Sequence, residues 1–526
     1  MEKNYQDVLD RLPGVAGIVR ECGGLSLEEY AGSLYRHEKQ SIQPREDLIE
    51  VVGRYARRLL GDKTAALLEN HFADTPVALT ANHHGVDYSA LTVQGTIIFS
   101  LPRLLAGSPE IIPVVPVLAF GIVPLNNFSF PRGIALSRAI MSAGQSAEKD
   151  KTQVKIPVIP VKNAQTLVSA AGPVTREMVL RSLKKVEKLA GEGTILESEE
   201  SSLSALLSEE YLRDEILCLT DYSDQAVALN SVVWNRMFAA CLRDELPELA
   251  YLEIERVVAA LLEKDLHDDT SLLHNLLFDP LLREELLHSL DKKFGCWNIS
   301  QLEKLSSPGA QGTPSYESYR GCGTAFFWQV DHKGRRMPLA LKTDGPRPYL
   351  SGVPPGTGDR VPLTPESLVH GLKERKLFPG LFTSFATLAF ARGIKCIGGF
   401  KQVDYLQDMQ QGLLKALETQ GHNDWTNKIA GMSTANFVTG MNIALAHYPD
   451  GQMSSAGAIG IIASGGLTRS DIERIKTLTV EEANLAGLLV TYPEFCGGDR
   501  PEEGWFSSLK AYVMDRSGEK LVHIRL

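Results

Sequence analysis

Segment 76–100 has the pattern of a buried strand, a polar loop and a helix, and this pattern constrains the fold more than any other. The strand is predicted in the apolar run 76–80, and the helix follows the loop. Two further short runs, 111–116 and 156–161, are rich in Val and Ile and contain Pro, which is typical of short buried strands. A helix is predicted near 175–190. The chain is therefore predicted to have an α/β fold with mixed sheets and flanking helices.

Changes in composition divide the 526 residues into three regions, in agreement with a length typical of roughly two to four domains. Residues 1–195 combine amphipathic helices with the α/β unit. Residues 196–300 are rich in Leu, Glu and Asp at helical spacing, which predicts a central all-helical subdomain. Residues 301–526 have mixed character and predict a C-terminal α/β or α+β domain. Within it, the Ser, Pro and Gly of 306–318 predict a linker, and 509–526 is predicted to be a closing hairpin.

The formal net charge of -10 argues against a general nucleic-acid binder, which needs a basic surface to neutralise phosphates. The seven cysteines are scattered, and no pair has the CxxC spacing of a zinc or redox site. The N-terminal segment lacks the apolar core of a secretory signal. These features favour a soluble protein of the reducing cytoplasm.

Two long apolar stretches, 91–105 and 111–125, are candidates for membrane spans. The first is interrupted by Gln94, Pro102 and Arg103, and the second contains several prolines. Both are shorter than the roughly twenty residues that a span needs. We expect a core helix and a buried strand instead, with no transmembrane segment, although peripheral membrane contact is compatible with this composition.

The loop at 82–87 (Asn-His-His-Gly-Val-Asp) concentrates ionisable side chains where the predicted strand meets the predicted helix. Loops at strand ends in α/β proteins can hold reactive side chains in place and expose them. His83 and Asp87 form a His-x-x-x-Asp pattern, in which an imidazole acts as general base and a carboxylate orients it. The alternative is structural, with satisfied histidines and Asp87 capping the helix.

The chain also resembles glycerolipid acyltransferases of the lysophosphatidic-acid acyltransferase type. These enzymes carry an Asn-His-x-x-x-x-Asp loop between a strand and a helix, then a Phe-Pro-Glu-Gly block, then an apolar block containing Val-Pro-Val. This chain has Asn82 and His83 with Asp87, then Phe-Pro-Arg-Gly at 130–133, then Ile-Pro-Val-Ile-Pro-Val at 156–161. The order of the blocks is the same.

The resemblance implies that His83 is the general base, that Asp87 orients it, and that the Pro-containing block helps to hold a phosphate-bearing acceptor. It covers about residues 75–165 and has two departures: Arg132 stands in place of the family's Glu, and the His-to-Asp spacing is one residue shorter. The spacing also matches the His-x-x-x-Asp loop of plant-type and condensation-domain acyltransferases. Those usually have Gly after the Asp, where this chain has Tyr88.

A second polar block at 126–133 follows the apolar stretch that ends at residue 125. It contains two amides, a hydroxyl and Arg132, whose guanidinium can bind a carboxylate or phosphate with two parallel hydrogen bonds. Asn, Ser, Pro and Gly also favour turns for backbone reasons alone. We predict that Asn127 and Arg132, together with Asn82 and His84, contact the substrate.

Two Gly-Gly pairs, at 398–399 and 465–466, follow apolar runs that are predicted to be strands. Such turns allow close backbone approach and can bind anions at a helix N-terminus. Lys395 and Lys401 flank the first pair and could attract an anion. For both pairs the preferred interpretation is an ordinary turn, with the two lysines exposed to solvent.

Two other classes of function remain open. A metal-dependent hydrolase or oxidase could use His83, His84 and Asp87 as ligands, although adjacent histidines on a strand point to opposite faces and zinc sites need three or four protein ligands. A non-enzymatic binding or assembly protein would use the histidines structurally. Loose candidates for a further metal ligand are His37, His71 and His332.

The preferred hypothesis is an acyltransferase-like enzyme with His83 and Asp87 as catalytic residues. It would have no bound metal or cofactor and would take its acyl group from acyl-CoA or an acyl carrier. The expected partner is a small-molecule or lipid-like substrate, not nucleic acid.

Overall fold

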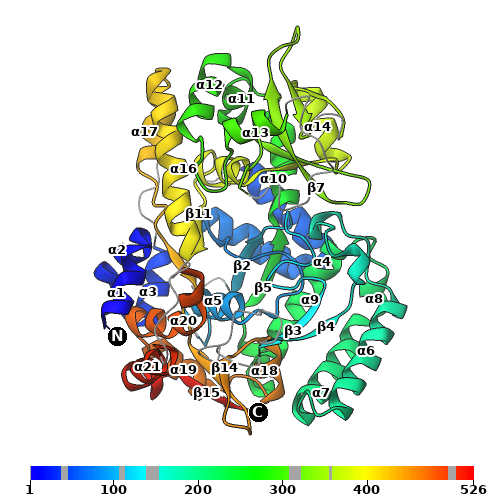
Figure 1. Ribbon diagram of the computed structural model, residues 1–526, viewed down its shortest axis with the longest axis vertical. Coiled ribbons are helices and arrows are strands. Elements are labelled where there is room, and N and C mark those ends of the chain that lie inside the picture. The colour runs from blue at the N-terminus through cyan, green and yellow to red at the C-terminus, as the bar shows by residue number, and fades with distance from the viewer. Residues whose placement is uncertain are drawn as a thin grey trace.

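The computed structural model describes residues 2–36, 46–105, 113–137, 153–306, 321–354, 358–495 and 505–526 (Figure 1). Its centre is a five-stranded parallel sheet with the order β12-β11-β1-β2-β5. The strands are β1 (Val77–Leu79), β2 (Val114–Ala119), β5 (Glu248–Glu253), β11 (Lys395–Gly399) and β12 (Phe437–Thr439). The predicted α/β class with mixed sheets and flanking helices is confirmed.

Smaller sheets lie on either side of this centre. A five-stranded antiparallel sheet has the order β10-β6-β7-β8-β9, and a three-stranded sheet has the order β14-β13-β15. In Figure 1 the first lies at one end of the molecule with α11 to α14, and the second lies at the other end with α18 to α21. A separate antiparallel pair is formed by β3 (Gly133–Ser137) and β4 (Gln153–Pro157). The strands of the other two sheets are β6 (Phe327–Val330), β7 (Arg336–Lys342), β8 (Tyr349–Gly352), β9 (Val361–Pro362), β10 (Leu377–Pro379), β13 (Ala444–His447), β14 (Met453–Ser455) and β15 (Val522–Arg525).

The helices cover both faces of the central sheet and surround the smaller ones. They are α1 (Glu2–Asp10), α2 (Pro13–Cys22), α3 (Leu27–Leu34), α4 (Glu46–Asp74), α5 (Ala90–Ser100), α6 (Arg176–Gly191), α7 (Glu197–Ala205), α8 (Asp214–Leu217), α9 (Tyr222–Arg236), α10 (Ile254–Asp265), α11 (Leu272–Phe278), α12 (Pro280–Ser289), α13 (Ile299–Leu305), α14 (Pro365–Lys373), α15 (Leu381–Phe385), α16 (Phe400–Thr419), α17 (Asn423–Ala430), α18 (Ala458–Ala463), α19 (Arg469–Thr477), α20 (Val480–Phe495) and α21 (Trp505–Val513).

The central sheet separates two hydrophobic cores. Along β1, Val77 and Leu79 pack into one core and Ala78 packs into the other. Along β2, Val115 and Val117 likewise face the first core. Alternate side chains of a strand point to opposite faces, and parallel strands covered on both faces consist of apolar runs. This double burial explains why the strand segments are continuous apolar runs.

Three sequence predictions are corrected by the structure. Between 196 and 300 only helices were expected, but β5 lies there and pairs with β2 along its whole length. The apolar run before the second Gly-Gly pair forms helix α18, where a strand was expected. The expected closing hairpin at 509–526 is instead the end of α21 followed by β15, which runs parallel to β13. A short apolar run does not by itself distinguish a buried strand from a buried helix.

The three predicted regions all contribute strands to the central sheet. Residues 1–195 supply β1 and β2, 196–300 supply β5, and 301–526 supply β11 and β12. The predicted linker 306–318 lies outside the described residues, apart from Ser306.

Among the described residues, no helix has both the length and the apolar content that crossing a membrane would require.

A buried histidine anchors the end of α4 against β1. His71 Nε2 lies 2.7 Å from the carbonyl oxygen of Val77, and its Nδ1 lies 3.1 Å from Nη2 of Arg103. A carbonyl only accepts and a guanidinium only donates, so the ring must be neutral with its proton on Nε2. Burial, together with the charge of Arg103, lowers the pKa of His71 to about 3. Both ring nitrogens of His71 therefore have partners within the core, and the prediction of His71 as a metal ligand is wrong.

The stability of the protein should therefore fall as the pH drops below about 6.5. The folded pKa of His71 lies below its unfolded value, so the unfolded chain binds a proton that the folded chain excludes. The contribution of neutral His71 to the free energy of unfolding is fully present above pH 6.5. It is lost progressively toward pH 3, and the loss is about 2 kcal/mol at pH 5. His71→Gln should reduce the difference in unfolding free energy between pH 7 and pH 5 by about this amount in urea titrations. An unchanged difference would contradict the assignment.

Candidate active site

A cavity lies at the point in the central sheet where the order of strand addition along the chain reverses. The chain adds β2 and then β5 on one side of β1, and later places β11 and β12 on the other side. In open parallel sheets, ligands bind outside the carboxyl ends of the strands at such a point. The cavity has a volume of about 730 Å³ and is lined by residues at the ends of four strands: Thr80, Phe120, Gly399 and Thr439. This volume is typical of a site for a small molecule.

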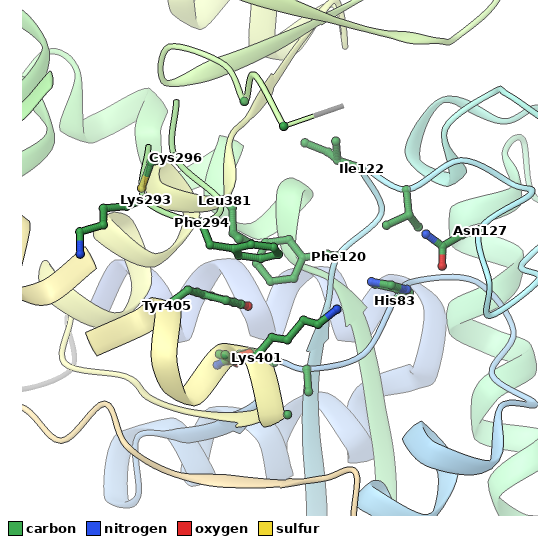
Figure 2. Close-up of a pocket in the computed structure, with 18 of the residues that line it drawn as sticks. His83, Phe120, Ile122, Asn127, Lys293, Phe294, Cys296, Leu381, Lys401 and Tyr405 are labelled. Carbon is green, nitrogen blue, oxygen red and sulfur yellow. Dashed lines mark hydrogen bonds between the residues drawn. The ribbon is translucent and has the colours of Figure 1, made fainter. Parts of the chain in front are cut away.

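The cavity walls are mainly aromatic and aliphatic. Figure 2 shows His83 and Asn127 on one side, Phe294 and Tyr405 on the other, and Lys401 extending between them. The Phe294 ring stacks on Tyr405 at 5.3 Å between ring centroids. Other apolar and aromatic lining residues are Phe120, Ile122, Phe128, Trp297, Trp328, Leu381 and Phe400. Such walls favour an apolar chain over a fully polar ligand.

The backbone of the 82–87 loop extends β1 beside the end of β2. Phe120 donates its N–H to the Asn82 carbonyl at 3.0 Å, and His84 donates its N–H to the Phe120 carbonyl at 2.8 Å. Because successive side chains of such an extended segment alternate, His83 faces the cavity while Asn82 and His84 face the interior. The hydroxyl of Tyr251 donates to the His83 carbonyl at 3.0 Å and holds the loop from behind.

His83 is a neutral imidazole at the cavity wall. Burial lowers its pKa to about 4, with Arg336 adding to the effect and hydrogen bonding to the Asn127 side chain opposing it. Its ring makes an edge contact with Phe128, at 5.2 Å between centroids. At pH 7 the ring is unprotonated, which is the state that a general base needs. Asn127 lies beside it at the cavity.

Asp87 does not supply the orienting carboxylate that the sequence analysis predicted. Its Oδ1 accepts from the Thr92 hydroxyl at 2.6 Å and from the Ser89 N–H at 3.1 Å, and its Oδ2 accepts from Asn82 at 3.3 Å. None of the hydrogen bonds described for Asp87 reaches the His83 ring. Burial raises the pKa of Asp87 to about 6, and the bond from Thr92 limits the rise. The N-cap residue of α5 is Ser89, so Asp87 binds the start of the helix through Ser89 and Thr92 without being its N-cap residue.

Asn82 and His84 lie behind the cavity and are not among its described lining residues. The Asn82 amide donates to Asp87 and to the Thr96 hydroxyl, the latter at 3.2 Å. His84 Nε2 lies 2.9 Å from the Ser223 hydroxyl, and burial lowers the pKa of this histidine. Both side chains are fully buried. In this geometry they support the loop and do not contact the cavity.

Arg132, the predicted anion clamp, also lies away from the described lining of the cavity. Its guanidinium donates to the Ile159 carbonyl at 3.4 Å and lies 4.7 Å from the centroid of the Phe130 ring. The positive charges at the cavity come from Arg336 and Lys401, together with two lysines at its rim, Lys292 and Lys293. The sequence analysis considered Lys401 as a residue that could attract an anion beside a Gly-Gly turn and preferred an exposed lysine; Lys401 is exposed and also lines the cavity. Nothing in the sequence signalled Arg336. Lys395, which was expected to be exposed, is buried in β11.

The two histidines and Asp87 do not converge on a common point. His83 faces the cavity, His84 faces Ser223 and Asp87 faces Thr92. Within the described ranges, no group of three or more His, Cys, Asp or Glu side chains is placed to hold a metal ion.

Comparison with protein-family models, with curated proteins and with solved structures finds no significant match to this chain. Its function must therefore be inferred from the chemistry of the cavity.

Proposed function

We propose that the protein is an acyltransferase-like enzyme in which His83 is the general base. The observation that carries this proposal is a neutral imidazole, with Asn127 beside it, on the wall of a largely apolar cavity at the carboxyl ends of the strands. The aromatic walls suit an acyl chain. The expected donor is a thioester such as acyl-CoA or an acyl carrier.

In the proposed reaction, His83 takes the proton of the acceptor's hydroxyl as its oxygen attacks the thioester carbonyl. A carbon–oxygen bond forms, the carbon–sulfur bond breaks, and the imidazolium returns the proton to the leaving thiolate. Burial disfavours the imidazolium, as the lowered pKa of His83 indicates. A developing negative charge on the substrate would offset that cost during the transfer.

His83→Gln should reduce acyl transfer by about 100-fold to 10,000-fold, because general-base catalysis contributes on this order. The measurement is the release of free thiol from acyl-CoA thioesters of increasing chain length, with and without alcohol acceptors. His267→Gln is the matched control, because His267 is exposed just beyond the C-terminal end of α10 and its ring hydrogen-bonds to the Glu263 carbonyl. Undiminished thiol release in His83→Gln would remove His83 from the mechanism.

The missing contact between His83 and Asp87 favours a second candidate, a protein that binds an amphipathic ligand without transforming it. The same assay separates the two. A wild-type protein that binds acyl-CoA in the cavity but releases no thiol with any acceptor would support the binding function.

A further inference from the structure

A row of aromatic rings leads from the His83 loop to the surface of the protein. Phe120 begins the row, because it pairs with His83 in a parallel bridge at the end of β2. Its ring lies 5.5 Å from that of Phe385, and the ring of Tyr405 lies 6.0 Å from Phe385 and 5.3 Å from Phe294, all between centroids. Phe120, Tyr405 and Phe294 line the cavity (Figure 2). Aromatic side chains present large apolar surfaces, so the row forms a continuous apolar track.

Two exposed phenylalanines mark the places where the cavity meets solvent. Phe128 is 64% exposed and lies beside His83, at 5.2 Å between ring centroids. Phe294 is 59% exposed and stands at the other end of the aromatic row. Both side chains also line the cavity, so each lies at the boundary between the cavity and solvent. The cavity therefore has one boundary near the proposed base and a second boundary at Phe294.

The Phe294 ring is held at the cavity by contacts with α16. One face of the ring stacks on Tyr405, with an angle of 22° between the ring planes. The neighbouring Lys293 pairs with Asp408 of the same helix at 2.8 Å between nitrogen and oxygen. On the other side, Gly295 has a φ of 76°, a left-handed conformation that favours glycine and lets the chain turn directly after Phe294. These contacts restrict the ring before any ligand binds, so a chain that meets it encounters a fixed obstacle.

We propose that Phe294 determines the longest unbranched alkyl chain that the cavity accepts. A chain whose polar end lies at His83 runs along Phe120 and Tyr405, and its methyl end meets the Phe294 ring. An extended row of rings contacts an extended chain along its whole length, whereas a compact ring system contacts only part of the row. The assignment of the chain to an acyl group rests on the proposed acyl transfer, whereas the length limit does not.

The test measures the affinity of the whole protein for unbranched primary alcohols, from butanol to dodecanol, by isothermal titration calorimetry. In the wild type, each added methylene should tighten binding by about fourfold, because burial of a methylene contributes on this order. This gain should stop at the alcohol whose methyl end reaches Phe294, and that chain length is the break. Phe294→Ala should move the break to longer alcohols, because it removes the ring that the chain meets. Phe294→Trp should move it to shorter alcohols.

Phe128→Ala is the matched control. Phe128 is similarly exposed and lines the same cavity, but it lies beside His83. Its replacement should leave the break at the wild-type chain length, whatever its effect on overall affinity. Opposite shifts in Phe294→Ala and Phe294→Trp also separate a length limit from a disturbed loop, which would move the break in the same direction in both variants.

A break at the same chain length in the wild type and in both Phe294 variants, or no gain with chain length at all, would overturn the proposal. Tighter binding of 1-adamantanol, a compact alcohol with as many carbons as decanol, than of decanol would overturn it too. His83→Gln should keep the wild-type break, because the alcohols bind without reacting. A shifted break in the Phe294 variants without thiol release from any acyl-CoA would reject the acyl transfer and leave the length limit standing.

Discussion

Arg392→Met is expected to lower the free energy of unfolding by about 3–5 kcal/mol, because it leaves two buried carboxylates without their counter-charge. The Arg392 side chain is fully buried. It donates to Asp47 at 2.8 and 3.3 Å, to Asp265 at 2.9 and 3.0 Å, and to the Thr387 carbonyl at 3.0 Å. These bonds join α4, α10 and the segment before β11. The measurement is urea unfolding followed by circular dichroism.

Arg54→Met is the matched control for this prediction. Arg54 pairs with Glu50 at 3.2 Å, and both side chains are largely exposed. Exposed pairs contribute about 0–1 kcal/mol, so the same substitution should have little effect there. Adding Asp47→Asn and Asp265→Asn to Arg392→Met should recover part of the loss. A loss no larger than that of Arg54→Met would show that the buried network does not stabilise the fold.

Gln94→Leu is expected to cost about 3 kcal/mol or more, because several buried backbone groups lose their hydrogen-bond partner. The Oε1 of this fully buried side chain accepts from the N–H groups of Ile443 at 2.6 Å and Ala444 at 3.0 Å. Its Nε2 donates to the carbonyls of Ala444 at 3.0 Å and Ala456 at 2.9 Å, and to the Ser455 hydroxyl at 3.2 Å. One amide thus joins α5 to β13 and the end of β14.

Gln407→Leu is the control for this second prediction. The Gln407 amide makes its described hydrogen bond to the Val403 carbonyl of its own helix, at 3.0 Å, and the side chain is only partly buried. That substitution should cost less than about 1 kcal/mol. If thermal unfolding of Gln94→Leu matches that of Gln407→Leu, then the amide is not needed to join α5 to β13 and β14.

Gln94 and Arg103 show which features of a polar side chain a local sequence pattern can predict. In the sequence they were interruptions that made a membrane span improbable. In the structure, Gln94 satisfies backbone groups far along the chain, and Arg103 donates to His71 and lies 3.7 Å from the centroid of the Tyr35 ring. The sequence shows that a polar side chain interrupts an apolar run. Its partners are set by tertiary packing.

The parts of the site that could be predicted are those encoded locally. The apolar run of β1, the polar loop and the helix α5 follow one another along the chain, and the boundaries agree to within a few residues. His83 was singled out and lines the cavity, as does Asn127. The pairing of His83 with Asp87 could not be settled from spacing. It depends on which way the loop turns after β1, and hydrogen bonds to Phe120, Tyr251 and Thr92 decide that direction.

The sequence by itself determined the strand-loop-helix that presents His83 and the alternation that turns His84 away from it. Only the tertiary structure decided which residues face His83 across the cavity. Parallel strands bring their carboxyl ends together only after long crossovers, so the Gly-Gly turn and Lys401, far along the chain, meet the His83 loop through the strand order β11-β1-β2. Strand order is set by the burial of both sheet faces, which no short stretch of sequence records.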